Sequence, residues 1–214
     1  MLRKSAIERA VNILRQKASL ARPQGKQVHR IISEGLQIAV AKSALGQMNL
    51  ALRPAHYDSQ LLLAQDIAIA LKDFVLIGAL KGEDEALGFA ALNWTALRCL
   101  IEIQTLGRVS GRALARGRAS TRTDFALVAP FIDDVLRSMP LKGLSARLQE
   151  ALKGLRLVFP AKDPDALSLW LSSSHFTIFQ TSFSVEDVAD NLMIMAGVPC
   201  EIMSLGAVMQ NGEG

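Results

Sequence analysis

Apolar residues follow two patterns that alternate along this chain. Over 27–46 they recur every three or four positions, which predicts a helix, and Gly46 stands where a C-terminal cap is expected. Residues 48–53 alternate between apolar and polar, which predicts a strand with one buried face. The polar segment 57–60 predicts a turn or the start of a helix.

Two continuous apolar runs follow at 74–80 and 86–92, separated by a short polar connection. Their length and spacing predict a β-hairpin. Asn93 is suited to cap a helix that continues through Leu106, and Gly107 is suited to end it. The sequence therefore predicts a hairpin that leads directly into a helix with well-defined ends.

The segment 107–122 is polar, contains glycine and arginine, and has no apolar period, so we expect an exposed loop. Thr121 and Asp124 then predict a capped helix start, and the helical period continues to Met139. Pro130 interrupts this pattern and should kink the helix or mark its true first turn. The remaining apolar runs predict four strands, at 155–159, 167–171, 176–185 and 192–196.

The same order of elements occurs twice. Each copy is read as a helix, an extended segment, a short irregular excursion and two apolar strands. Phe74 and Phe176 stand 102 positions apart, and Leu87 and Leu192 stand 105 apart. Two copies are too few for a solenoid. We therefore expect a single three-layer α/β/α domain in which the two copies share one sheet and superpose through a rotation near twofold.

Basic residues gather in two places. Residues 1–30 contain eight basic residues and one acidic residue, and 98–122 contain six arginines and one acidic residue. The first group includes an amphipathic helix expected over 4–20, which the Pro- and Gly-containing segment 21–25 should break. This predicts a basic N-terminal helix and linker over 1–25, a domain over 26–200 and a tail over 201–214. No aromatic residues are interleaved with the arginines of the second group, which argues against nucleic-acid binding.

The composition limits the classes of protein to which this chain can belong. Half of the 214 residues are hydrophobic, which excludes disorder throughout the chain. The sequence contains no apolar run long enough for a transmembrane segment and no recognisable signal peptide, so a cytoplasmic location is expected. Cys99 and Cys200 fit no metal-binding spacing, and we expect both to be reduced thiols.

Catalytic patterns are scarce. The three histidines lack neighbours with ligand spacing, and Ser172–His175 reads as a turn because no third group is available to orient the imidazole. Trp94 and Trp170 are expected to belong to the core. We therefore predict no catalytic residues, no cofactor and no metal site.

Four segments together resemble the middle domain of the flagellar motor switch protein FliM, whose fold also occurs in the CheC and CheX phosphatases. They are Met48–Gln60, Asp73–Asn93, Trp94–Asp124 and Arg156–Pro199, and the resemblance covers about 27–200. The family's acidic N-terminal peptide, which binds phosphorylated CheY, is replaced here by the basic helix. The family's C-terminal SpoA domain has no counterpart before the chain ends.

The resemblance implies a non-enzymatic component of the flagellar motor switch, or C-ring, which couples chemotaxis signals to rotor direction. Such a protein would be cytoplasmic and peripheral, at the flagellar basal body on the inner membrane. It would bind a FliG-like rotor protein and pack against copies of itself in a ring, and FliN and a CheY-like regulator are further candidate partners. The residues implied for partner binding are Gly107, Arg108, Val109, Ser110, Gly111 and Arg112.

Two alternatives have the same fold. One is a CheC-like phosphatase that removes phosphate from the aspartyl-phosphate of a response regulator. Its catalytic Glu-x-x-Asn pattern is missing here, since Glu34 is followed by Gln37 and Glu102 by Thr105. The other alternative is an SctQ-like component of the sorting platform of type III secretion.

Overall fold

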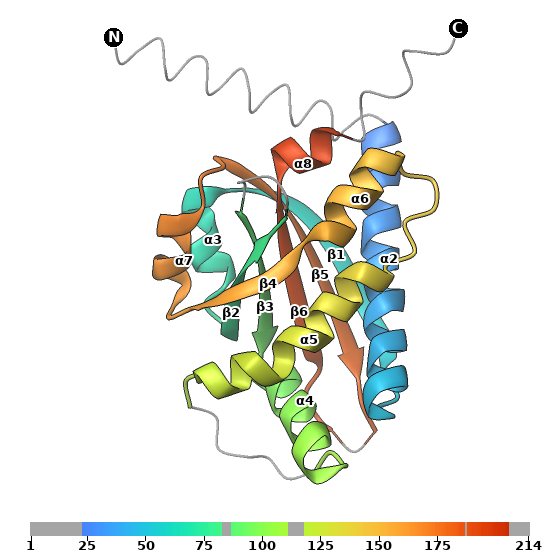
Figure 1. Ribbon diagram of the computed structural model, residues 1–214, viewed down its shortest axis with the longest axis vertical. Helices are drawn as coiled ribbons and strands as arrows, with labels where there is room; N and C mark the ends of the chain where they lie inside the picture. Colours follow the sequence, from blue (N-terminus) through green and yellow to red (C-terminus); the bar gives the residue numbers. More distant parts are fainter. Residues whose placement is uncertain (1–22, 83–86, 111–117, 187, 206–214) are drawn as a thin grey trace, which may run out of the picture.

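One six-stranded antiparallel sheet organises the chain (Figure 1). The computed structural model describes residues 23–82, 87–110, 118–186 and 188–205, so the helix expected over 4–20 lies outside the described residues. The first copy consists of α2 (Pro23–Met48), β1 (Arg53–Leu63), α3 (Ala64–Ala70), β2 (Phe74–Lys81), β3 (Leu87–Asn93) and α4 (Trp94–Leu106). The second consists of α5 (Arg122–Ser138), α6 (Ala146–Gly154), β4 (Arg156–Ala161), α7 (Pro164–Trp170), β5 (His175–Ser184), β6 (Leu192–Pro199) and α8 (Cys200–Ser204).

The order of the strands confirms the internal duplication. It runs β1-β5-β6-β3-β2-β4, and every neighbouring pair is antiparallel. Exchanging the equivalent strands of the two copies (β1 with β4, β2 with β5, β3 with β6) gives the same order reversed. The pseudo-twofold axis therefore passes between β3 and β6, where Ala90 lies opposite Ala196.

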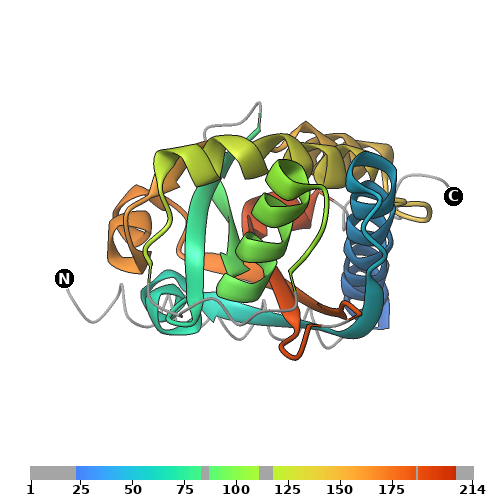
Figure 2. The same cartoon turned by 90° about the horizontal axis from the view of Figure 1, so that it is seen from below.

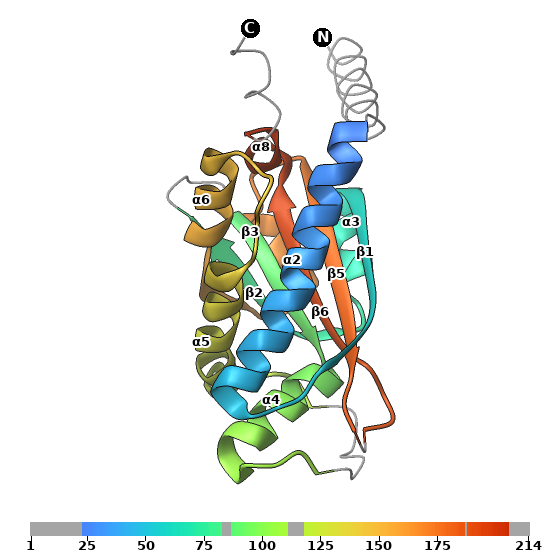
Figure 3. The ribbon, with the colours of Figure 1, turned by 90° about the vertical axis from the view of Figure 1, so that its right-hand side faces the viewer.

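Helices cover both faces of the sheet, so the molecule has the expected three layers. The long helices α2 and α5, together with α4, α6 and α8, pack on one face over the larger hydrophobic core (Figures 1 and 3). The short helices α3 and α7 pack against each other on the other face, over a smaller core. Burial of these two apolar layers is the main source of stability.

The two central strands approach each other closely at Gly197. This residue lies opposite Phe89, whose side chain is fully buried. A Cβ atom at position 197 would lie 2.1 Å from the Phe89 ring, so only glycine fits there.

The predicted boundary between α2 and β1 is wrong. The helix begins at Pro23, continues through Gly46 and ends at Met48. Asn49 adopts the left-handed conformation with a φ of 51°, which Asn tolerates unusually well among residues with a side chain. The Leu50 amide then donates to the Ala44 carbonyl (3.1 Å), which closes the helix end.

The strand predicted over 48–53 and the turn predicted over 57–60 are also wrong. A single long strand, β1, begins at Arg53 and extends through residues 57–60. It pairs with β5 from Arg53 opposite Ser184 to Leu63 opposite His175. This long-range pairing overrides the local preference of polar residues for a turn.

Among the elements later in the chain, some predictions are correct and others are wrong. The strands expected near 155–159, 176–185 and 192–196 are present as β4, β5 and β6, but the one expected over 167–171 is the helix α7. Asp163 caps α7 by accepting from the Ala166 amide (2.7 Å). Thr121 and Asp124 form the expected capping box of α5, whereas Pro130 lies inside that helix and does not mark its first turn.

Candidate partner-binding tip

Helix α4 lies at the end of the molecule that faces the viewer in Figure 2. Its first turn is fixed by Asn93, whose side-chain oxygen accepts from the Ala96 amide (2.9 Å). It ends at Gly107, which has a φ of 69° and donates its amide to the Ile103 carbonyl (3.0 Å). Glycine suits this left-handed cap, so both predicted ends of the helix are confirmed. We refer to Leu106–Ser110, the end of α4 and the residues that follow it, as the tip.

Ser110 holds the tip against α4. Its backbone amide donates to one carboxylate oxygen of Glu102 (2.7 Å) and its hydroxyl donates to the other (3.0 Å). Its carbonyl accepts from Arg98 (2.9 Å), and Arg98 lies 3.7 Å from Glu102. Both charged side chains are buried, and these bonds satisfy every polar group of Ser110. The described part of the loop is therefore fixed in position.

The residues predicted for partner binding differ in exposure. Arg108 is exposed, and Ser110 is half-buried by its bonds to α4. Val109 is also half-buried, because its side chain packs against the protein's own core. Gly111 and Arg112 lie outside the described residues. Val109 therefore offers a partner less apolar surface than a fully exposed side chain would.

Leu106 is the apolar residue that the tip presents to solvent. Its surface is 63% exposed, whereas Leu97 and Leu100 of the same helix are buried. Position 106 lies on the same side of the helix as the buried Cys99 and Glu102, so the helical period gives no signal for its exposure, which comes from its place in the last turn of α4. The exposed surface of the tip thus combines Leu106, Gly107 and Arg108.

The other end of the loop is also anchored. Arg118 makes two hydrogen bonds to Asp124 in the first turn of α5, one of them 2.8 Å long. Its guanidinium also lies 5.9 Å from the centre of the Trp94 ring on α4. The hydrogen bond from Arg118 holds the pKa of Asp124 below its usual range, and the Thr121 amide acts in the same direction. These contacts connect α4 with the start of α5.

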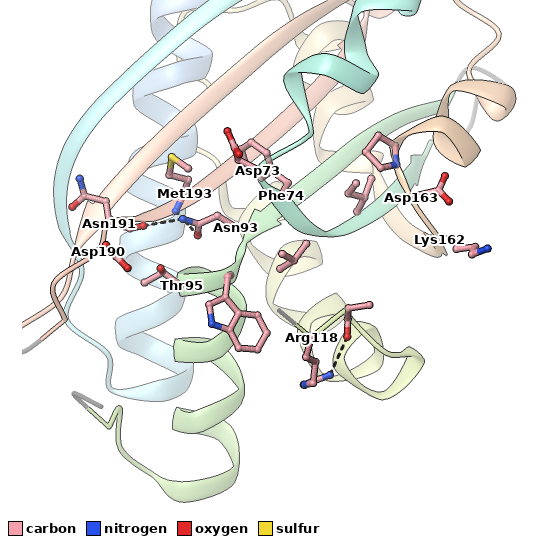
Figure 4. Close-up of a pocket in the computed structure, with 15 residues that line it drawn as sticks. Asp73, Phe74, Asn93, Thr95, Arg118, Lys162, Asp163, Asp190, Asn191 and Met193 are labelled. Carbon is pink, nitrogen blue, oxygen red and sulfur yellow. Dashed lines mark hydrogen bonds between the residues drawn. The ribbon is translucent and has the colours of Figure 1, made fainter. Parts of the chain in front are cut away.

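A cavity of about 720 Å³ opens beside this contact (Figure 4). Its walls include Asp73, Trp94, Arg118 and Lys162. The charges on the walls are mixed, and Arg118 is already paired with Asp124. The cavity therefore indicates no particular class of ligand.

The serines and the histidine of 173–175 do not form a catalytic triad with the other residues that the structure describes. Ser174 Oγ lies 2.7 Å from His175 Nδ1, but the other ring nitrogen is buried without a hydrogen-bond partner in the described part of the chain. The Ser173 hydroxyl donates to Glu201 (2.7 Å) rather than to the imidazole. Within the described ranges, no third group therefore orients this histidine for base catalysis.

The described residues give little support for a metal-binding site or for a reactive thiol. The described residues contain no group of three or more His, Cys, Asp or Glu side chains that could hold a metal ion. Both cysteines are free, and burial raises the pKa of the Cys99 thiol and of the Cys200 thiol to about 11. Both thiols are thus protonated and weakly nucleophilic at neutral pH.

No family model and no curated protein sequence matches this chain. Solved structures do match. FliM in the FliM–SpeE complex of H. pylori is 10% identical, with a TM-score of 0.60 over 88% of this chain and 98% of that one. FliM in the H. pylori FliG–FliM complex is 11% identical, with a TM-score of 0.57 over 85% and 96%. Thermotoga maritima FliY is 10% identical, with a TM-score of 0.57 over 88% and 96%. The chain therefore has the fold of a FliM middle domain.

Proposed function

We propose that this chain is a non-enzymatic component of a flagellar motor switch that binds a FliG-like rotor protein through the tip of α4. The observation that carries this proposal is an asymmetry between the two copies. Helix α4 has 13 residues, whereas α8, its counterpart in the second copy, has five. The duplicated domain thus extends one helix beyond the sheet, and that helix carries the exposed tip.

The chemistry of the tip suits a protein partner. Leu106 offers an exposed apolar contact, and Arg108 offers a guanidinium that can pair with a carboxylate in two directions at once. The bonds of Ser110 to α4 fix the backbone before binding, so little conformational entropy remains to be lost. We infer that the partner presents a small apolar pocket with an acidic rim.

A FliG-like partner is favoured because one of the matching structures is a complex of FliG with FliM. In the proposed role the protein also packs against copies of itself to form part of the C-ring. FliN and a CheY-like regulator are further candidate partners. We place it in the cytoplasm, peripheral to the inner membrane at the flagellar basal body, where it would couple chemotaxis signals to rotor direction.

Within the described residues, none of the helices is both long enough and apolar enough to cross a bilayer.

A phosphatase role is the weaker alternative. Glu102 is buried, and Ser110 and Arg98 occupy its carboxylate, so it is not free to orient a water molecule. Glu34 is bound by Arg30 (3.9 Å) and Tyr57 (3.4 Å). We expect the purified protein to leave the decay rate of a phosphorylated response regulator unchanged. Acceleration that disappears in Glu34→Ala would overturn the non-enzymatic assignment.

The binding proposal is tested by titrating the protein with the FliG-like rotor domain encoded by the same genome. Leu106→Asp should weaken the Kd at least about tenfold, because a carboxylate replaces the apolar contact. Arg108→Glu should mainly slow association and reduce its dependence on salt. The matched control is Leu169→Asp on α7, since Leu169 is also exposed but lies on the opposite layer.

Both leucines are exposed, so all variants should keep the circular dichroism spectrum of the parent. Equal affinity of the parent and the Leu106→Asp protein would exclude the tip as the binding site. Equal loss of affinity in Leu106→Asp and Leu169→Asp would indicate a general effect of added charge, and would also contradict the proposal.

A further inference from the structure

Helices α3 and α7 occupy equivalent places in the two copies and pack against each other on the face of the sheet opposite α2 and α5. Ile67 and Leu167 are completely buried against the sheet. Two residues later on each helix, Ile69 and Leu169 are 70% and 85% exposed, and Trp170 is 39% exposed. We call Ile69, Leu169 and Trp170 the α3/α7 surface. Three exposed apolar residues on two neighbouring short helices indicate an interface.

The charges around the α3/α7 surface are predominantly acidic. Four aspartates and two lysines lie within α3 and α7 or within three residues of their ends: Asp66, Lys72, Asp73, Lys162, Asp163 and Asp165. None of these six side chains forms an ion pair within the part of the chain that the structure describes. The walls of the neighbouring cavity add Asp190 and Arg118, and Arg118 is itself paired with Asp124, so the excess of carboxylates remains. The surface therefore favours a basic occupant.

Other exposed apolar residues lie among different charges. On α2, Ile38 and Leu45 are 45% and 56% exposed. Glu34 stands one turn before Ile38 and Lys42 stands one turn after it, so the charges there are balanced. The tip carries the exposed, basic Arg108. Of these three places, the α3/α7 surface is therefore the one that combines apolar contact with an excess of negative charge.

Residues 1–22 precede the described part of the chain and have the complementary composition. They contain six basic residues and one acidic residue. Ile7, Val11 and Leu14 fall on one side of the helix expected over 4–20. Such a segment offers apolar side chains to the α3/α7 surface and lysine and arginine side chains to the surrounding carboxylates.

This segment also lies within reach of the α3/α7 surface. It is joined directly to Pro23, the first residue of α2, and this end of α2 lies at the same end of the molecule as α3 (Figure 3). The helix expected over 4–20 would be about 25 Å long. A short tether gives an effective concentration of roughly 1 mM, so a contact with a Kd of about 0.1 mM is occupied about 90% of the time. The attached segment therefore outcompetes a free protein at micromolar concentration.

We propose that residues 4–20 dock on the α3/α7 surface of their own chain, with the apolar side of the segment facing Ile69 and Leu169. The inference does not depend on the proposed switch function. The surface lies away from α4, so the docked segment leaves the tip free for another partner (Figure 1). A basic segment of another protein reaches the same surface only by displacing residues 4–20.

Zero-length cross-linking of the full chain at micromolar concentration tests this contact. A carbodiimide joins a lysine ammonium group to a carboxylate that it touches, and mass spectrometry identifies the joined peptides. We expect Lys4 or Lys17 to be joined to an aspartate of α3 or α7. A mixture of light and ¹⁵N-labelled chains identifies the source of the segment. Docking within one chain joins peptides of the same isotope, whereas cross-links between the two isotopes would show binding to a second copy and overturn the proposal.

Hydrogen exchange of the full chain adds a second test, in which each variant is measured at the other element. Leu169→Asp should make the amides of 4–20 exchange about tenfold faster, because the segment then loses its 90% occupancy. Leu106→Asp, the matched control at the tip, should leave them unchanged. Val11→Asp should speed exchange in α7, whereas Gln16→Asp adds the same charge on the opposite side of the segment and should not.

Unchanged exchange of 4–20 in Leu169→Asp would overturn the proposal, and so would equal acceleration in Leu106→Asp. The same holds if Val11→Asp and Gln16→Asp affect α7 equally. The rotor-domain titration reports separately on the tip, so the two proposals fail independently.

Discussion

Replacing Glu102 by alanine tests whether the tip is held by α4. The variant loses both hydrogen bonds from Ser110 to a buried carboxylate, and bonds of this charged kind contribute roughly 1.5–3 kcal/mol each. Removing one member of a buried ion pair costs about 3–5 kcal/mol. Arg98 keeps its bond to the Ser110 carbonyl, which favours the lower end of that range. We therefore expect the free energy of unfolding to fall by about 3 kcal/mol.

The matched control is Glu34→Ala. Glu34 also follows an arginine by four residues on a helix, but its ion pair with Arg30 is exposed. Exposed pairs contribute under about 0.5 kcal/mol, so this variant should be close to the parent.

Urea denaturation of the three proteins measures the difference. For a domain of this size, a loss of 3 kcal/mol corresponds to a fall in Tm of roughly 6–12 °C. Hydrogen exchange adds a local reading, since the Ser110 amide should exchange faster in Glu102→Ala than in Glu34→Ala. Equal stability of the two variants, with Ser110 still protected, would refute the role assigned to Glu102.

Two further predictions concern other parts of the fold. Because the folded-state pKa of Asp124 is lowered, its bond to Arg118 should stabilise the protein above about pH 4 and lose that effect as the pH falls further; an acid titration should therefore destabilise Asp124→Asn less steeply than the parent. Gly197→Ala places a methyl group against the Phe89 ring and should lower the free energy of unfolding by about 1–3 kcal/mol. Gly46 is exposed, so Gly46→Ala should instead leave the free energy of unfolding unchanged or raise it. Equal free energies of unfolding for Gly197→Ala and Gly46→Ala, measured by urea denaturation, would contradict the close approach of β3 and β6.

Sequence reasoning succeeded where local signals decide the structure. The β2–β3 hairpin and both ends of α4 follow from apolar runs and from the capping preferences of Asn93 and Gly107. The duplication was visible in element order, and it predicted one shared sheet. The hairpin and the two helix ends depend on residues close together in the chain.

The sequence predictions were wrong where contacts between residues far apart in the chain determine the structure. The polar residues of β1 extend because β5 supplies their hydrogen-bond partners more than a hundred positions later. Arg98 and Glu102 showed a helical i,i+4 spacing, but their bonds to Ser110 depend on the path of the loop. The same path turns Val109 inward and leaves Leu106 exposed.

Hydrogen exchange of the protein, measured alone and with the FliG-like rotor domain, tests the central claim most directly. The account predicts slower exchange on binding at the end of α4 and the following residues, 104–110, and no change in α3 or α7. Tight binding with unchanged exchange at 104–110 and protection elsewhere would contradict the assignment of the tip as the partner-binding site.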